Sequence, residues 1–149
     1  MLVFKFGGAS VKSADAVKNI VRILQRYPDE EIVVVVSAMG KTTNALEKII
    51  ACYADQDTDC FRKEFDLLKA YHMEIVQGFV PDGEHPVFNT VESLFGEFEQ
   101  RLSKEPTLNY DYDYDQLICF GELLSTSIIS HFFNESEVPT RWMDIRKSL

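Results

Sequence analysis

Residues 2–36 read LVFKFGGASVKSADAVKNIVRILQRYPDEEIVVVV, and this stretch decides the fold. It opens on a short β-prone apolar run that ends at a pair of glycines. It closes on residues 32–36, which are apolar and β-branched without alternation, the pattern of a parallel strand covered on both faces. Between the two runs, apolar residues recur at helical spacing: Val17, Ile20, Val21 and Leu24. The order strand, helix, strand predicts a right-handed βαβ unit.

The helix of this unit has recognisable ends. Ser13 is a suitable N-cap, and the helix is expected to stop before Pro28, because the residue before a proline is pushed out of the α region. Further along, helical spacing predicts more helices, over about 46–53, 61–79, 86–102 and 115–133. An acidic, tyrosine-rich loop is expected over 104–114 and a third strand over 140–143. The sequence therefore predicts one α/β domain with an inserted helical layer.

The composition excludes several classes of protein. The 149 residues, 46% of them apolar, are typical of one soluble globular domain. A net charge of −9 argues against nucleic acid as the main partner, because phosphate backbones attract basic surfaces. No secretory signal is visible, and no run approaches the roughly 18 apolar residues of a membrane span. We therefore expect a cytoplasmic protein with neither a nucleic-acid nor a membrane partner.

The sequence also predicts reduced thiols and no metal site. The three cysteines contain no CxxC pair, which is typical of thiols in a reducing compartment. The three histidines show no metal-like spacing to one another or to the cysteines. A calcium-loop pattern of carboxylates begins at Asp111, but Gln116 stands where that loop needs a glycine.

The first candidate site is the turn Lys5-Phe6-Gly7-Gly8-Ala9-Ser10, which joins the first strand to the first helix. Glycines at such a junction let backbone N–H groups turn inward, and the helix N-terminus adds partial positive charge, so anions bind there. Lys5 can place an ammonium against phosphate oxygens, and Ser10 adds a hydroxyl. The alternative is a plain glycine turn beside an exposed lysine, since the segment has neither the GxxxxGK nor the GxGxxG pattern.

The second candidate is the loop over residues 37–44, SAMGKTTN, after the second strand. Ligands gather at the carboxyl ends of strands in open parallel sheets, so this loop is expected to face the same crevice as the glycine loop. The hydroxyls of Ser37 and Thr43 are suited to hold a small polar substrate. The alternative is helix capping by Thr42, Thr43 or Asn44, which does not exclude binding.

The third candidate is Glu122, which follows Gly121 in a helix otherwise rich in apolar residues. A carboxylate at the rim of a buried helix can pair with the ammonium of a substrate. The alternative is an ordinary solvated glutamate on a helix surface.

Together the three segments resemble the aspartate kinases, within the amino-acid kinase superfamily. The family's KFGGTSV stands here as KFGGASV over residues 5–11, and its VVSAMGxTT followed by Asp or Asn stands as VVSAMGKTTN over 35–44. Its GE-x-LS helix start stands as GELLS over 121–125. The last residues look like the family's strand followed by D-x-R. Order and spacing agree over essentially all 149 residues.

The resemblance implies a three-layer α/β sandwich, with a mainly parallel sheet flanked by helices, of the amino-acid kinase or carbamate kinase type. Residues 1–149 would be its N-terminal part only. The rest of the kinase domain and any regulatory ACT domains would lie outside this chain. The chain alone is therefore expected to be inactive, and the full-length protein to form a homo-oligomer.

The implied activity is ATP-dependent phosphorylation of the side-chain carboxylate of L-aspartate, the first step of the branch to lysine, threonine and methionine. The resemblance makes Lys5 the catalytic contact to the transferring phosphate. Lys5, Phe6, Gly7, Gly8 and Ser10 would bind ATP. Mg²⁺ would arrive with ATP, and no tightly bound cofactor is expected.

The same resemblance assigns Ser37, Thr43 and Glu122 to the binding of aspartate, with Glu122 meeting the α-ammonium. Ala9 departs from the family pattern, where threonine is usual, but the backbone and Ser10 remain. One alternative is another member of the superfamily, acting on glutamate, acetylglutamate or a nucleoside monophosphate; the second and third signatures favour aspartate. An alternative from a different class is a non-catalytic module that binds a small molecule.

Overall fold

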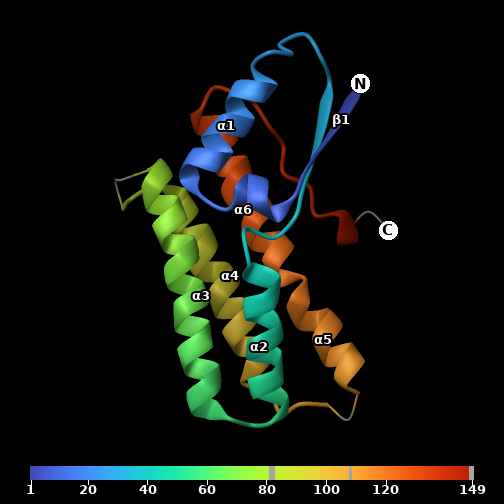
Figure 1. Cartoon of the computed structure of the whole chain (residues 1–149), viewed down its shortest axis with the longest axis vertical. Helices are drawn as coiled ribbons and strands as arrows, with labels where there is room; N and C mark the ends of the chain where they lie inside the picture. Colours follow the sequence, from blue (N-terminus) through green and yellow to red (C-terminus); the bar gives the residue numbers. More distant parts are fainter. Residues whose placement is uncertain (81–82, 108, 148–149) are drawn as a thin grey trace.

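The computed structural model describes residues 1–80, 83–107 and 109–147 and shows an α/β arrangement. A small parallel sheet lies at one end, and helices form the rest of the molecule (Figure 1). Strands β1 (Leu2–Phe6) and β2 (Ile32–Val36) pair in register, with Leu2 opposite Ile32 and Phe6 opposite Val36. The predicted α/β fold with a parallel sheet and flanking helices is confirmed.

Helix α1 (Ala14–Leu24) makes the crossover between the two strands, after a short 3₁₀ turn η1 (Gly8–Val11). The side chain of Ser13 caps α1 by accepting a hydrogen bond from the Ala16 amide at 3.3 Å. The four apolar residues of the predicted face of α1 are all buried. The predicted βαβ unit and its N-cap are therefore confirmed.

The sheet is covered on one face, which corrects the expectation of a strand buried on both. Successive strand residues point to opposite faces, and the alternate residues Phe4, Phe6, Ile32 and Val34 pack against the core. On the other face Val3 is 62% exposed, and Val33 and Val35 are each 44% exposed. The unbroken apolar run therefore reflects a sheet whose outer face is left open by the described part of the chain.

Long helices form a bundle that extends away from the sheet (Figure 1). Its members are α2 (Thr42–Ala54), α3 (Thr58–Phe79), α4 (Pro86–Leu102) and α6 (Phe120–Glu135), and α6 contacts β2. Phe65 of α3 lies 5.6 Å from Phe95 and 5.8 Å from Phe98 of α4, measured between ring centroids. Phe98 lies 5.0 Å from Phe120 of α6. These rings join three helices into one core.

The tyrosine-rich segment forms a helix where a loop was expected. Helix α5 (Tyr110–Ile118) begins at Asn109, whose side chain accepts a hydrogen bond from the Tyr112 amide at 3.2 Å. Asp113 is buried and accepts a hydrogen bond from the Thr107 amide at 2.7 Å. Two acidic residues in the first turn also suit the positive end of the helix dipole. The chain then bends at Cys119, so the helix predicted over 115–133 is divided between α5 and α6.

The stretch Tyr110–Glu135 is long and apolar enough, by length and composition, to cross a membrane. Over the 18-residue window that meets this criterion, however, 56% is buried inside the protein. Helix α6 buries residues on most of its circumference, including Phe120, Leu124 and Ile128. This degree of burial is typical of a helix in the core of a protein.

The strand predicted over 140–143 does not form among the described residues. The Thr140 amide donates to Oδ1 of Asn134 at 2.9 Å, and Nε1 of Trp142 donates to Oγ1 of Thr126 at 2.9 Å. Side chains of α6 thus hold this segment, where a sheet ladder was expected. A short 3₁₀ turn, η2 (Ile145–Lys147), follows it.

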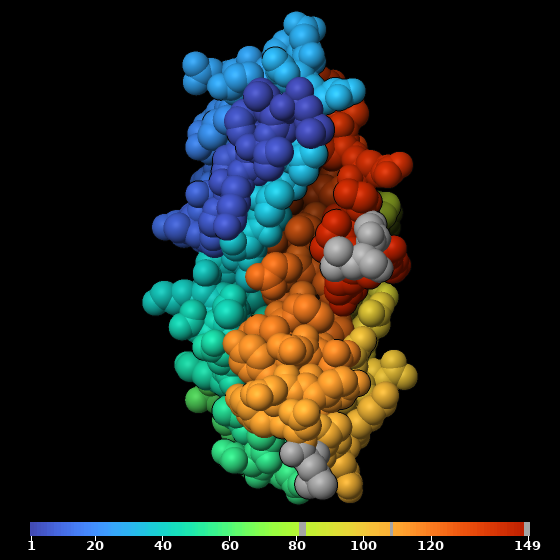
Figure 2. Space-filling view, turned by 90° about the vertical axis from the view of Figure 1, so that its right-hand side faces the viewer, coloured from blue at the N-terminus to red at the C-terminus, as the bar shows by residue number. Residues whose placement is uncertain are grey.

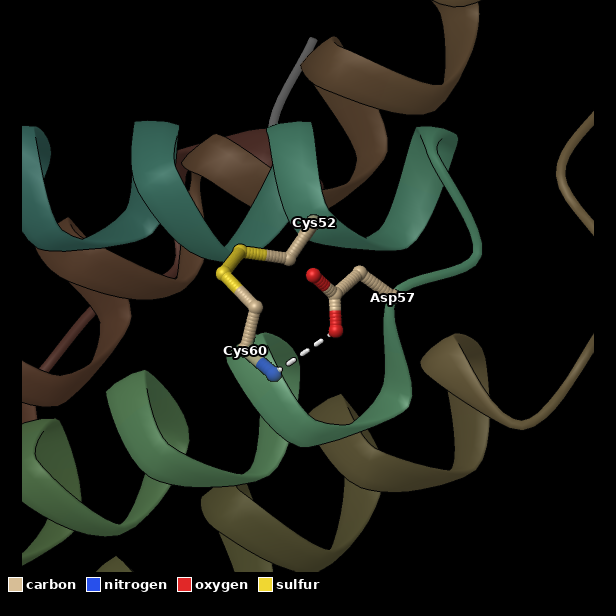
Figure 3. Close-up of a disulfide and its surroundings, with 3 residues drawn as sticks. All are labelled: Cys52, Asp57 and Cys60. Atoms are coloured by element: carbon tan, nitrogen blue, oxygen red, sulfur yellow. Dashed lines mark hydrogen bonds between the residues drawn. A yellow bond between two sulfur atoms is a disulfide. The ribbon is translucent and has the colours of Figure 1, made fainter.

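The structure also corrects the expectation of three reduced cysteines. Cys52, near the end of α2, and Cys60, in the first turn of α3, form a disulfide (Figure 3). The turn between the helices brings their Cα atoms to 5.8 Å, within the range that a disulfide spans. Asp57 shapes this turn, because its carboxylate accepts a hydrogen bond from the Cys60 amide at 3.0 Å. A pair separated in this way carries no CxxC signal, and Cys119 is a free thiol.

Candidate functional site

The glycine loop lies at the carboxyl end of β1, in contact with the loop that follows β2. The Gly40 amide donates a hydrogen bond to the Gly8 carbonyl at 3.0 Å. A Cβ atom on Gly8 would lie 2.8 Å from the Ala38 carbonyl oxygen, so only glycine allows this approach. Within the turn, the Ser10 amide donates to the Gly7 carbonyl at 2.9 Å. The prediction that the two loops lie at one edge of the sheet is confirmed.

The second loop continues the sheet ladder for one residue and then starts α2. The Ser37 amide donates to the Phe6 carbonyl at 3.0 Å, which fixes Ser37 beside the glycine loop. Thr42 is buried at the start of α2, and Thr43 beside it is exposed. The N-cap position of α2 is Lys41, which makes no capping hydrogen bond through its side chain. The sequence-based alternative, capping by a threonine or asparagine side chain, is therefore wrong.

The start of α6 docks onto this second loop. A Cβ atom on Gly121 would lie 3.0 Å from the Cβ of Ala38 and 3.4 Å from Cγ2 of Thr42. One turn further along α6, the hydroxyl of Ser125 donates a hydrogen bond to the Ser37 carbonyl at 2.8 Å. The three segments that resemble kinase signatures therefore touch one another through the second loop.

The side chains predicted to bind ligands stand at the surface of this cluster. Lys5 is exposed, and because it pairs opposite Val35 it lies on the open face of the sheet. Ser10, Thr43 and Glu122 are also exposed, and Ser37 is half-buried. Over the described ranges, neither the Lys5 ammonium nor the Glu122 carboxylate has an ion-pair partner, so both are available to a ligand.

Figure 2 shows the face on which these segments meet. In this view β2 and the loop after it, in light blue to cyan, and the C-terminal segment, in red, flank a hollow, with α6 in orange at its floor. Glu122 belongs to the first turn of that helix. The hollow therefore lies between the sheet edge and α6.

Beneath the second loop, His72 of α3 supports the start of α2. Its Nδ1 lies 2.9 Å from the Leu68 carbonyl, which can only accept, so Nδ1 carries the proton. Nε2 then accepts from the Thr42 hydroxyl at 3.4 Å. Burial lowers the pKa of His72 to about 4, against a weaker opposing effect of the Leu68 hydrogen bond. His72 is therefore a neutral core histidine at physiological pH.

The C-terminal segment adds a charged pair beside α6. Nη2 of Arg146 lies 2.7 Å from Oδ2 of Asp144, and Nε of Arg146 donates to Oδ1 at 2.9 Å. These hydrogen bonds from Arg146 lower the pKa of Asp144 to about 2. Nη1 of the same guanidinium lies 3.6 Å from Sγ of Cys119, at the start of α6. The residues that look like the family's D-x-R motif thus tie the C-terminal segment to the helix that carries Glu122.

The chemistry of the cluster suits two ligands side by side. Backbone amides of a glycine turn and a lysine ammonium are phosphate-binding groups, and they lie at the end of β1. Hydroxyls and a carboxylate, from Ser37, Thr43 and Glu122, are groups that hold the polar atoms of an amino acid. Sequence reasoning gave no role to Ser125 or to His72; the signal for both was a polar side chain within an apolar helical face.

The comparison with known proteins defines the class. The model of the amino acid kinase family matches residues 1–149, and the chain belongs to this family. Aspartokinase 1 from the chloroplast of Arabidopsis thaliana is 34% identical over 95% of this chain. Bifunctional aspartokinase/homoserine dehydrogenase 2 of Escherichia coli is 26% identical over 97% of it. The chain spans about a quarter of the length of the first relative, 25%, and 18% of the second.

Solved structures show the same fold. Escherichia coli aspartokinase III in complex with lysine and aspartate has a TM-score of 0.84 over 99% of this chain and 32% of its own. The complex of that enzyme with aspartate and ADP has a TM-score of 0.83. Both are 24% identical to this chain.

Proposed function

We propose that this chain is the N-terminal portion of the kinase domain of an aspartate kinase, carrying the phosphate loop and the amino-acid pocket. The supporting observation is the contact of three segments that are far apart in sequence: Gly8 against Gly40, and Ser37 against Ser125. These contacts bring an anion-binding loop next to a loop and a helix that offer hydroxyls and a carboxylate. The aspartokinase relatives favour aspartate as the amino acid.

In this proposal the side-chain carboxylate of L-aspartate attacks the γ-phosphorus of ATP. The bond from that phosphorus to the bridging oxygen breaks, and the products are 4-phospho-L-aspartate and ADP. Phosphoryl transfer depends mainly on positioning and on neutralising charge. Lys5 supplies a positive charge to the transferring phosphate, and the amides of the glycine loop bind phosphate oxygens. Mg²⁺ enters with ATP as part of the substrate.

The pocket side chains hold aspartate in line for this attack. Glu122 pairs with the α-ammonium, while Ser37 and Thr43 donate hydrogen bonds to carboxylate oxygens. The product would then feed the branch to lysine, threonine and methionine. A homo-oligomeric state and a cytoplasmic location belong to the same proposal.

A substrate panel tests this function in the intact enzyme. L-Aspartate, L-glutamate, N-acetyl-L-glutamate and UMP are offered with MgATP, ADP release is measured, and the acyl phosphate is trapped with hydroxylamine. We expect ADP release and a trapped acyl phosphate with L-aspartate and with none of the other three acceptors. A signal with another acceptor would indicate a different member of the family, and aspartate binding without ADP release would indicate a non-catalytic module. The 149-residue chain by itself is expected to bind without turnover.

A further inference from the structure

Ser125 makes the contact that joins α6 to the second loop. Its side chain is fully buried, and its hydroxyl donates to the Ser37 carbonyl at 2.8 Å across 88 residues of sequence. The Ser37 amide is already bonded to the Phe6 carbonyl at 3.0 Å. Both backbone groups of Ser37 are therefore fixed, one by the sheet and the other by α6.

Gly121 makes the second contact on the same face of α6, one turn before Ser125. It has no Cβ, and one placed there would lie 3.0 Å from the Cβ of Ala38 and 3.1 Å from Cδ1 of Leu46. Residues four apart share one face of a helix, so α6 meets the second loop at two points. Together, these two contacts fix the position of α6 along its axis and its rotation about that axis, relative to the second loop.

Glu122 lies between these two contacts in sequence and is exposed on the neighbouring face. Its distance from Ser37 and Thr43 therefore depends on how α6 sits on the loop. We propose that Ser125 is a positioning residue for the amino-acid pocket, which holds Glu122 and the second loop in the relative arrangement that binds aspartate. This inference rests on the proposed function and goes beyond it, because Ser125 does not touch the substrate.

The test compares Ser125→Ala with Ser127→Ala in the 149-residue chain. Ser127 is another buried serine of α6, but it lines the side of the helix that faces α4. Isothermal titration calorimetry gives the Kd for L-aspartate. We expect Ser125→Ala to raise this Kd roughly three- to tenfold, the effect of one hydrogen bond, and Ser127→Ala to leave it within about twofold. Ser125→Cys, which keeps a weak donor of similar size, is expected to lie between Ser125→Ala and the wild type.

A double mutant separates positioning from general support of the fold. If Ser125 acts through the placement of Glu122, the effect of Ser125→Ala on the aspartate Kd should shrink in a Glu122→Gln background. Additive effects of the two substitutions would overturn the proposal. So would a Ser125→Ala variant that loses thermal stability but keeps the wild-type aspartate Kd.

Amide hydrogen exchange provides a readout that needs no ligand. The Gly40 amide, bonded to the Gly8 carbonyl, and the Thr42 amide, bonded to the Met39 carbonyl at 3.0 Å, report the order of the second loop. We expect both to exchange faster in Ser125→Ala, relative to core amides of α3, and to be unchanged in Ser127→Ala. If the wild-type chain fails to bind aspartate, the proposed function is in doubt. The exchange rates then decide whether Ser125 orders the loop: unchanged rates would overturn the inference.

Discussion

The amide of Gly40 donates a hydrogen bond to the carbonyl of Gly8 at 3.0 Å, and this bond joins the glycine loop to the loop after β2. The approach is close enough that a Cβ on Gly8 would lie 2.8 Å from the Ala38 carbonyl oxygen and 3.0 Å from that of Gly40. Both neighbours are backbone atoms, which cannot rotate away. The two loops can therefore lie this close only because residue 8 is a glycine, which has no Cβ.

Gly8→Ala is expected to destabilise the chain by about 1–3 kcal/mol, because the added methyl group forces the two loops apart. The measurement is urea unfolding of the 149-residue chain followed by circular dichroism. Gly96→Ala is the matched control, since Gly96 is an exposed position within α4 and its added Cβ would meet nothing within 4 Å. That variant should be more stable by up to about 1 kcal/mol. Equal effects of the two substitutions would contradict the tight contact at Gly8.

The buried histidine predicts a pH dependence. His72 has a pKa of about 4 in the folded chain and an ordinary value of 6.5. The unfolded chain therefore binds more protons between these values, so stability falls as the pH falls from about 6.5 to about 4. The contribution of His72 is full above pH 6.5 and on the order of 3 kcal/mol at most.

This dependence is measured by urea unfolding at about pH 7 and about pH 4.5, with His72→Gln as the comparison. The variant keeps a side chain that can accept from the Thr42 hydroxyl, but it cannot take up a proton in this range. We expect its stability to fall less on acidification than that of the wild type. An equal loss of unfolding free energy in the wild type and in His72→Gln would show that burial does not lower the pKa of His72.

Much of the fold could be predicted because its signals are local. The spacing of apolar residues in α1, the N-cap at Ser13 and the proline that opens α4 act within a few residues of one another, and the structure has all of them. Alternation of tyrosine and aspartate gave no helical period, so the first part of α5, residues 110–114, was predicted as a loop. Its formation depends on the Asn109 cap and on a hydrogen bond from the Tyr114 hydroxyl to Glu47 of α2 at 3.1 Å, which only the tertiary structure supplies.

The segments that form the site could be predicted from the sequence, but the contacts between them could not. The glycine turn and the second loop each follow a strand, and parallel strands put their carboxyl ends at one edge. The bond between Ser125 and Ser37 spans 88 residues, and no local pattern marks it. The same holds for the disulfide and for residues 140–143, whose conformation is set by side chains of α6.

Lys5→Met removes the ammonium while keeping most of the aliphatic side chain. In the intact enzyme we expect kcat to fall by about 10²–10³, because the transferring phosphate loses a preorganised positive charge. Lys18→Met is the control: Lys18 pairs with Asp15 at 3.6 Å on the surface of α1, and such pairs contribute little. Steady-state kinetics with MgATP and aspartate measure both variants. A kcat within a few-fold of wild type for Lys5→Met would make Lys5 an ordinary surface lysine.

The central claim is that Glu122 binds the amino acid while the glycine loop binds ATP, and Glu122→Gln in the intact enzyme tests it most directly. The substitution removes the charge but keeps the size and most of the hydrogen-bonding capacity. Hydrogen bonds to charged groups contribute about 1.5–3 kcal/mol, so the KM for aspartate should rise roughly ten- to hundredfold.

The measurement is steady-state kinetics with each substrate varied in turn, and Glu97→Gln, at an exposed glutamate of α4, is the matched control. We predict that Glu122→Gln raises the KM for aspartate and leaves the KM for ATP within about twofold, while the control changes neither. An equal rise in both KM values, or no rise for aspartate, would contradict the account.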